Sequence, residues 1–200
     1  MLMRRMPEYQ AAMADHSWPC FSPIRSISGS NIIMLGTGDI GSNTARRLSA
    51  LGAKVTGVCH SGKSSEPAFS HVVKTEGLDA LLPDADALIM ALPSTSATIG
   101  ILSRERIAKL GRRSLVINVG RGSAIDQEVL VEALEQRRIA GAALDVMTPE
   151  PLPGDHPLWS CPNTIITPHV SGNDALKYTR EADVSMFISD LKRYAEGEPP

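Results

Sequence analysis

Gly36-Thr37-Gly38-Asp39-Ile40-Gly41 follows an apolar run, Ile32 to Leu35, and precedes an amphipathic segment, Thr44 to Leu51. This order of residues predicts a strand, a glycine-rich turn and a helix. In a GxGxxG turn the first glycine allows the tight bend, the second leaves room for a pyrophosphate, and the third lets helix and strand pack closely. The start of a helix also offers unpaired N–H groups to phosphate. Because strand, spacing and helix agree, the stretch indicates a dinucleotide-binding site rather than a structural turn alone.

The composition is that of an ordinary globular protein, and it excludes several classes of function. The 200 residues are 42% hydrophobic and 21% charged, which is typical of a chain that folds around its own core. A net charge of −2 gives no electrostatic attraction to nucleic acid or to a membrane surface. No apolar run reaches the ~20 residues of a membrane helix, and no signal-peptide pattern follows the N-terminus. We therefore expect a cytoplasmic protein without nucleic-acid or membrane partners.

The cysteines and histidines predict neither a disulfide framework nor a metal site. The three cysteines are widely separated and odd in number: Cys20, Cys59 and Cys161. The spacing typical of metal ligands is missing from four histidines: His60, His71, His156 and His169. The sequence therefore predicts that no metal is bound.

Apolar runs and helical patterns alternate along the chain. Strands are expected at Asn31–Leu35, Lys54–Cys59, His71–Val73, Ala87–Leu92, Leu115–Val119, Ala140–Val146 and Thr164–Ile166. Besides the helix after the glycine turn, helices are expected at Pro7–Ala14, Leu78–Leu82, Ser103–Leu110 (capped by Ser103), Asp126–Arg137 (capped by Asp126) and Asn173–Glu196. Continuous apolar strands joined by helices predict an α/β fold with a doubly wound parallel sheet of the Rossmann type. Such sheets bind ligands at the carboxyl ends of their strands.

The segment after the second predicted strand bears on the choice of cofactor. An acidic residue ~20 residues after the glycines usually accepts a hydrogen bond from the ribose 2′-OH of NAD. No acid occurs between Lys54 and Lys63. Ser61 can donate to a 2′-phosphate, and His60 and Lys63 can add positive charge. The loop therefore favours NADP over NAD, and a solvated polar loop that accepts either cofactor is the alternative.

Three polar residues follow later strands. Arg121 stands between two glycines, free to project, and its planar guanidinium matches a carboxylate. Glu150 stands between two prolines, which predicts an extended loop. His169 has the side chain typical of a general acid–base near neutral pH. Taken singly, each is more typical of an ordinary surface or hydrogen-bonded side chain, so their meaning depends on their combination.

The motifs GTGDIG, NVGRG, ALDVMTPEPLP, PLW and ITPHVSG occur in the order and approximate spacing seen in the D-2-hydroxyacid dehydrogenases. The chain resembles this family from about Pro7 to Glu198, and most of all its glyoxylate/hydroxypyruvate reductase and phosphoglycerate dehydrogenase-like members. The resemblance implies hydride transfer, dependent on NAD or NADP, between a small 2-keto acid and a D-2-hydroxy acid. It also implies a homodimer.

The resemblance implies roles for single residues. His169 matches the group that protonates the substrate carbonyl, Glu150 the group that orients this histidine, and Arg121 the group that binds the substrate carboxylate. Asp145 matches the residue that binds the nicotinamide carboxamide. The cofactor-binding residues expected from motif and resemblance together are Gly36, Gly38, Asp39, Ile40, Gly41, His60, Ser61, Lys63, Leu92, Pro93, Thr98, Val119, Gly120, Arg121, Asp145, His169 and Gly172.

The chain also departs from the family, because the substrate-domain stretch that precedes the nucleotide domain is missing. We expect a helix left over from the interdomain region at 1–16, a linker at 17–30, a dinucleotide-binding domain at 31–172 and a closing helix at 173–200. An engineered fragment, a mis-assigned gene start and a naturally shortened protein would all have this sequence. We expect dinucleotide binding with weak or absent turnover. The alternatives are a dinucleotide-sensing, co-repressor-like interaction module and an inactive remnant.

Overall fold

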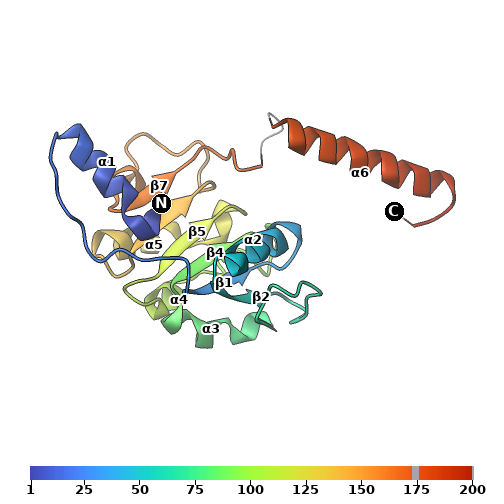
Figure 1. The fold of residues 1–200 in the computed structure, drawn as a ribbon, viewed down its shortest axis with the longest axis horizontal. Helices are drawn as coiled ribbons and strands as arrows, with labels where there is room; N and C mark the ends of the chain where they lie inside the picture. The colour runs from blue at the N-terminus through green and yellow to red at the C-terminus, as the bar shows by residue number, and fades with distance from the viewer. Residues whose placement is uncertain (173–175, 200) are drawn as a thin grey trace. The chain divides into compact units, whose positions relative to one another are not determined.

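A computed structural model describes residues 1–172 and 176–199, with Tyr178 described by its backbone alone. The chain divides into two compact units, Met1–Pro168 and His169–Pro200. The first unit contains the sheet and all described helices except α6, which belongs to the second (Figure 1). The domain boundaries expected from the sequence remain a prediction.

The first unit is built on a seven-stranded sheet in the order β3-β2-β1-β4-β5-β6-β7. The strands are β1 (Asn31–Leu35), β2 (Lys54–Val58), β3 (His71–Val73), β4 (Ala87–Met90), β5 (Leu115–Asn118), β6 (Gly141–Leu144) and β7 (Thr164–Ile166). All neighbouring pairs are parallel. The strand order reverses between β1 and β4, the place where a doubly wound sheet binds its ligand. The predicted α/β class and Rossmann-type topology are confirmed.

The helices occur close to their expected positions. They are α1 (Met6–Ala14), α2 (Asp39–Ala50), α3 (Leu78–Leu81), α4 (Arg104–Lys109), α5 (Gln127–Glu135) and α6 (Lys177–Ala195). Short 3-10 turns lie at Leu2–Arg4, Thr75–Gly77, Leu82–Asp84, Gly122–Ala124 and Pro157–Ser160. The expected closing helix is therefore present over Lys177–Ala195, while its predicted first turn, 173–175, lies outside the described residues.

Several predicted element ends were wrong. Four strands are shorter than expected, because the apolar sequence continues while the chain leaves the sheet. The Ala91 N–H still donates to Leu35 O at 2.9 Å, but the following residues turn away. Ser103 occupies the N-cap position of α4 without capping it: its hydroxyl donates to the Glu105 carboxylate instead, at 2.6 Å. Asp126 does cap α5, accepting from the Val129 N–H at 3.3 Å.

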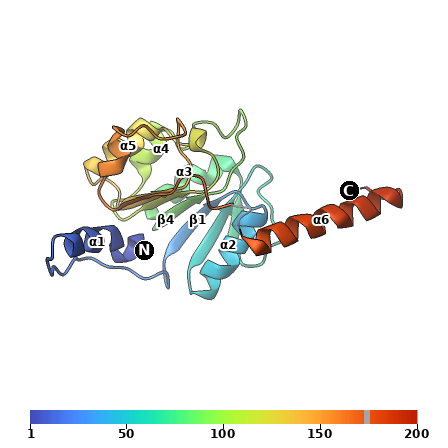
Figure 2. The same cartoon turned by 90° about the horizontal axis from the view of Figure 1, so that it is seen from above.

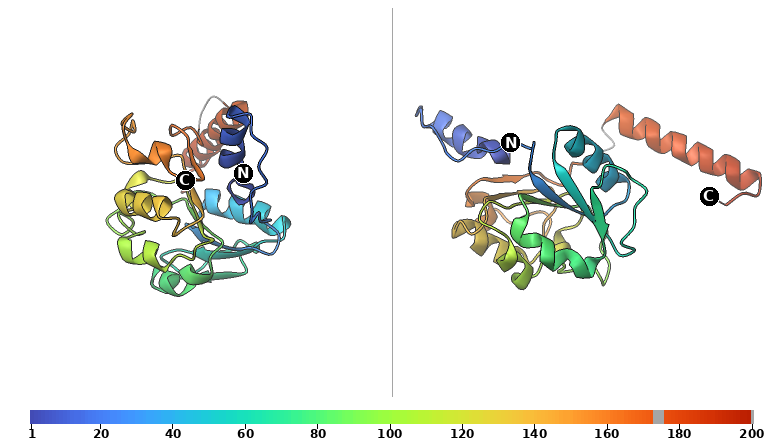
Figure 3. Two further views of the ribbon diagram at one scale, coloured as in Figure 1. Left: turned by 90° about the vertical axis from the view of Figure 1, so that its left-hand side faces the viewer. Right: turned by 60° about the horizontal axis from the view of Figure 1, so that its bottom comes forward.

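The two faces of the sheet are covered differently. Alternate strand residues point to opposite faces, so Ile33 and Leu35 join the core formed with α3, α4 and α5. Ile32 and Met34 join a smaller core formed with α2 and Leu2. Figures 2 and 3 show α4 and α5 on one side of the sheet and α1 and α2 on the other. In the part of the chain that the structure describes, no helix is long and apolar enough to cross a membrane.

Candidate functional site

The candidate site lies along the carboxyl edge of the sheet, where all seven strands end in one register. The residues paired across the sheet at this edge are Val73, Val58, Leu35, Met90, Asn118, Leu144 and Ile166. The chain segments singled out from the sequence begin directly after this row, so the parallel pairing gathers them at one edge.

The glycine turn after β1 has the geometry that its spacing predicts. Gly36 has φ +96°, and a Cβ there would lie 2.6 Å from Ala91 O. A Cβ at Gly41 would lie 2.0 Å from Gly36 O, so only glycine lets α2 pack on the turn. At Gly38, the N-cap of α2, a Cβ would meet no heavy atom within 4 Å among the residues that the structure describes. Open space therefore borders the second glycine and the helix start, and Asp39 and Ile40 are exposed beside it.

The loop after β2 exposes His60, Ser61 and Lys63. The Ser61 hydroxyl lies 3.2 Å from Lys63 O and 3.3 Å from Lys63 N, which closes a tight polar turn. Cys59 Sγ lies 3.4 Å from the same hydroxyl. Burial raises the pKa of the Cys59 thiol, but hydrogen bonds with Ser61, Thr37 and nearby backbone outweigh it, so the net pKa is lowered.

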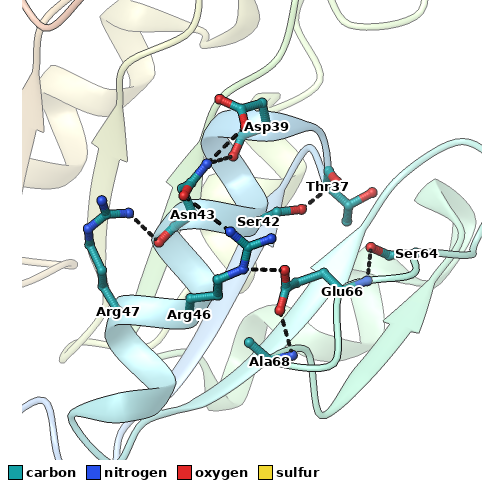
Figure 4. A network of polar contacts seen from close by, with 9 residues as sticks. All are labelled: Thr37, Asp39, Ser42, Asn43, Arg46, Arg47, Ser64, Glu66 and Ala68. Carbon is teal, nitrogen blue, oxygen red and sulfur yellow. Dashed lines mark hydrogen bonds and ion pairs between the residues drawn. The ribbon is translucent and has the colours of Figure 1, made fainter. Parts of the chain in front are cut away.

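The single acid of this loop, Glu66, is turned toward α2 (Figure 4). Arg46 Nε donates to Glu66 Oε2 at 2.6 Å, and the Ala68 N–H donates to Oε1 at 3.0 Å. The Arg46 hydrogen bond, and then the Ala68 hydrogen bond, lower the pKa of Glu66. Its carboxylate therefore stays ionised and paired with an arginine.

The loop after β4 contains Leu92, Pro93 and Thr98. Thr98 Oγ1 donates to Pro93 O at 2.5 Å and accepts from the Thr95 N–H at 2.9 Å. This hydroxyl therefore closes the loop on itself. Leu92 packs partly buried against the core on the α4–α5 side of the sheet.

The loop after β5 is held by Asn118, a fully buried residue that the sequence reasoning missed. Asn118 Oδ1 accepts from the Gly120 N–H at 3.0 Å, and its Nδ2 donates to Arg121 O at 2.9 Å. A polar residue that ends an apolar strand just before the glycines was the available signal. Val119 continues the sheet by donating its N–H to Met90 O at 3.0 Å.

The glycines that flank Arg121 have a packing role that the sequence reasoning did not predict. A Cβ at Gly120 would lie 2.7 Å from the Leu92 backbone, and a Cβ at Gly122 would lie 2.1 Å from Met147 O. These glycines let the loop after β5 pack against the loops after β4 and β6. This packing requires glycine whatever the conformation of the Arg121 side chain. Arg121 itself is exposed, and its Nη1 donates to Gly120 O at 2.7 Å.

The loop after β6 contains both predicted acids. Asp145 is 4% exposed and accepts from the Thr167 hydroxyl at 2.5 Å. Glu150 is exposed, and its Oε1 accepts from the Met147 N–H at 3.0 Å. The peptide bonds before Pro149 and Pro151 are both cis, and the chain bends here. The predicted extended loop is therefore wrong, because a backbone contact that the sequence pattern does not reveal folds the acid back.

Gln127, the first residue of α5, is a second residue that was missed. Its side-chain amide donates to Thr148 O at 2.7 Å and accepts from the Thr148 N–H at 3.0 Å. It thereby fastens the loop that contains Glu150 to the helical layer. Nothing local in the sequence distinguishes it from any helix-start glutamine.

His169 is the first residue of the second unit. It is exposed and has φ +55°, a left-handed conformation that is uncommon for a residue with a side chain. A Cβ at Gly172 would meet no heavy atom of the described residues within 4 Å, chain neighbours aside. The predicted contact of His169 with Glu150 and the substrate remains a prediction. Within residues 1–172 and 176–199, no cluster of three or more histidine, cysteine or acidic side chains could hold a metal ion.

Comparison with known proteins identifies the family. Residues 1–171 match the family model of the D-isomer specific 2-hydroxyacid dehydrogenase NAD binding domain. A hydroxypyruvate reductase of Blautia hydrogenotrophica is 33% identical over 177 residues, which cover 88% of this chain and 54% of the relative.

Solved structures give the same result. A D-isomer specific 2-hydroxyacid dehydrogenase of Xanthobacter autotrophicus, in complex with NADPH and MES, matches with a TM-score of 0.87 and 31% identity over 98% of this chain and 61% of that one. An NADPH-dependent glyoxylate/hydroxypyruvate reductase of Sinorhizobium meliloti, in complex with NADP and sulfate, matches with a TM-score of 0.84 and 31% identity, covering 98% and 62%. The chain thus spans little more than half the length of such relatives, and it belongs to the D-isomer specific 2-hydroxyacid dehydrogenase family as its NAD-binding domain.

Proposed function

We propose that this chain binds NADP(H) along the carboxyl edge of the sheet and serves the interconversion of a small 2-keto acid and a D-2-hydroxy acid. One observation carries the proposal: the glycine turn, the Arg121 loop and the loop with Asp145 and Glu150 all follow one row of paired strand ends. The open space beside Gly38 fits a pyrophosphate at the start of α2. Residues 31–172 are proposed as the dinucleotide-binding domain.

The preference for NADP(H) is supported by the loop after β2. His60, Ser61 and Lys63 are all exposed there, and the one acid of the loop is paired with Arg46. A hydroxyl donor and two basic groups suit a phosphate dianion better than a ribose hydroxyl. Both solved relatives described above were determined with NADPH or NADP.

The residues proposed for the chemistry have simple roles. The bound cofactor supplies or accepts the hydride. Arg121 binds the substrate carboxylate and polarises the neighbouring carbonyl. His169 exchanges a proton with the substrate oxygen, and Glu150 orients the imidazole. Asp145 accepts a hydrogen bond from the nicotinamide carboxamide in this proposal, and its burial and its hydrogen bond with Thr167 support a fixed position for its carboxylate. Because Arg121 and Glu150 are exposed to water, turnover by these 200 residues is expected to be weak.

We further propose that two copies of the chain pair. The support is an apolar hollow of about 660 Å³ on the α2 face, which is lined by the half-buried Ile89, Ile117 and Ile165. Parallel sheets are normally covered on both faces. Sedimentation should therefore show a dimer that Ile117→Asp converts to monomers, and a wild-type chain that stays monomeric at high concentration would disprove the pairing.

The enzymatic proposal is tested with His169→Ala and with His71→Ala as the matched control on an exposed strand end. Single-turnover oxidation of NADPH by glyoxylate or hydroxypyruvate, at high protein concentration, detects weak activity. His169→Ala should lower the rate at least ~100-fold and leave the Kd for NADPH unchanged, because the histidine transfers a proton. Equal rates of NADPH oxidation in wild type and His169→Ala would contradict the proposed enzymatic reaction with His169 as its acid–base. If NADPH binding changed only the association of this chain with a protein partner, the result would favour the alternative, a dinucleotide-sensing interaction module.

A further inference from the structure

The loop proposed to bind the 2′-phosphate contains an acid that could oppose it. Residues 59–70 join β2 to β3, and Glu66 is their only acidic residue, three positions after Lys63. A carboxylate released into this loop would repel a phosphate dianion, since two like charges several ångströms apart in a partly solvated site repel appreciably. The disposition of Glu66 therefore matters for the choice between NADP(H) and NAD(H).

The structure holds this carboxylate away from solvent. The Glu66 side chain is 6% exposed although it belongs to a loop. One oxygen accepts from Arg46 Nε and the other from the Ala68 N–H. The Glu66 N–H donates in turn to Ser64 Oγ at 3.2 Å, which fixes the turn that carries the acid (Figure 4). Hydrogen bonds to both carboxylate oxygens and from the Glu66 N–H thus fix the side chain and the adjacent backbone in one conformation.

The partner of Glu66 belongs to the helix that starts at the glycine turn. Arg46 lies in α2, and its Nη1 is 3.4 Å from Asn43 Oδ1. Asn43 Nδ2 donates to Asp39 Oδ1 at 2.9 Å, in the first turn of the same helix. A polar chain therefore runs from the start of α2, beside the proposed pyrophosphate position, to the loop proposed for the 2′-phosphate (Figure 4).

We propose that Arg46 and Glu66 form a latch that sets the preference for NADP(H) over NAD(H). The latch neutralises the only carboxylate of the loop and anchors the half that follows Lys63 to α2. Both are positioning residues, and neither is required to touch the cofactor. The inference rests on the proposed function, because it assigns a specificity device to the same site.

The test compares NADPH and NADH binding, followed by nicotinamide fluorescence at low ionic strength, in wild type and four variants. Arg46→Gln releases the Glu66 charge, so the Kd for NADPH should rise on the order of fivefold while the Kd for NADH changes by less than about twofold. In Arg46→Gln/Glu66→Gln the charge is gone and the two amides can still pair, so NADPH affinity should recover. Arg46→Lys retains the positive charge and should retain the preference.

Arg47→Gln is the matched control, because Arg47 is the next residue of α2 and its Nη1 donates to a backbone oxygen of the same helix, Asn43 O, at 2.8 Å. It should change neither Kd. The effect of Arg46→Gln should also shrink at high salt, as expected for a charge interaction at a partly exposed site. If Arg46 had a purely structural role, Arg46→Gln would weaken the binding of both cofactors together. The ratio of the two Kd values therefore distinguishes a structural role from the proposed effect on cofactor preference.

Two kinds of result overturn the latch alone. One is a wild type that prefers NADPH while Arg46→Gln keeps the same preference. The other is a double variant, Arg46→Gln/Glu66→Gln, whose Kd for NADPH is as high as that of Arg46→Gln. A wild-type chain that binds neither cofactor overturns the proposed function and the latch with it.

Discussion

The two halves of the carboxyl edge differ in what holds their loops. Around β1 and β2, the glycine turn is fixed by backbone contact and the following loop is tied to α2 by Arg46 and Glu66, all within one unit. Around β5 and β6, Asn118 and Gln127 fix the backbone, but Arg121 and Glu150 stay exposed. The loops proposed for cofactor binding are therefore held in place by the fold of the first unit itself. The part proposed for chemistry depends on side chains that the first unit does not bury.

The largest effect is expected at the glycine turn. Gly41→Val places a side chain where even a Cβ would lie 2.0 Å from Gly36 O, so we expect the free energy of unfolding to fall by about 3 kcal/mol or more. Urea unfolding measures it. Gly38→Ala is the matched control: its Cβ meets no protein atom, so stability should stay within about 0.5 kcal/mol while NADPH affinity falls. Equal stability of the two variants would remove the claim that the fold organises this half.

The next effect is expected in the other half, at the residue that fixes its backbone. Asn118→Ala leaves the buried Gly120 N–H without its acceptor, so the free energy of unfolding should fall by about 1–3 kcal/mol. The Kd for NADPH should change less than it does in Gly38→Ala, because the turn after β1 is untouched. If Asn118→Ala abolished NADPH binding in a folded protein, cofactor binding would depend on the half around β5 and β6 as much as on the half around β1 and β2.

The sequence predicted the local features well and the long-range ones poorly. The positions of the strands along the chain and the glycine turn follow from apolar periodicity and from spacing within a few residues, so both could be predicted from the sequence. The role of Gly120 depends on Leu92, and the latch joins residues 20 positions apart. Ser103 shows the same limit at short range: its position was right, yet its hydroxyl binds Glu105. A polar side chain often has several possible hydrogen-bond partners nearby in the sequence. The folded structure determines which of them it binds.

A smaller effect concerns pH. Arg46 lowers the pKa of Glu66, so ionised Glu66 stabilises the fold above its unfolded pKa of about 4.3, and this contribution is lost as the pH falls through the lower folded value. The free energy of unfolding should therefore decrease as the pH drops below about 4.5, and decrease less steeply in Glu66→Gln. Urea midpoints across this range measure both slopes. Identical slopes would show that the loop is not fastened by this ionised pair.

The smallest effect is expected outside both halves. Arg104 and Glu132 pair at 3.0 Å between α4 and α5, with side chains 58% and 43% exposed. Solvent screens such a pair, so Glu132→Gln should leave the urea midpoint and both cofactor affinities unchanged within error. A clear loss of NADPH affinity in this variant would show that the α4–α5 layer also contributes to cofactor binding.

Cofactor binding by the first unit is tested most directly by titrating the 200-residue chain with NADPH and NADH, followed by nicotinamide fluorescence. We expect saturable binding with a lower Kd for NADPH, because the turn after β1 and the loop after β2 are organised within the first unit. Binding of neither dinucleotide, or tighter binding of NADH, would contradict this expectation.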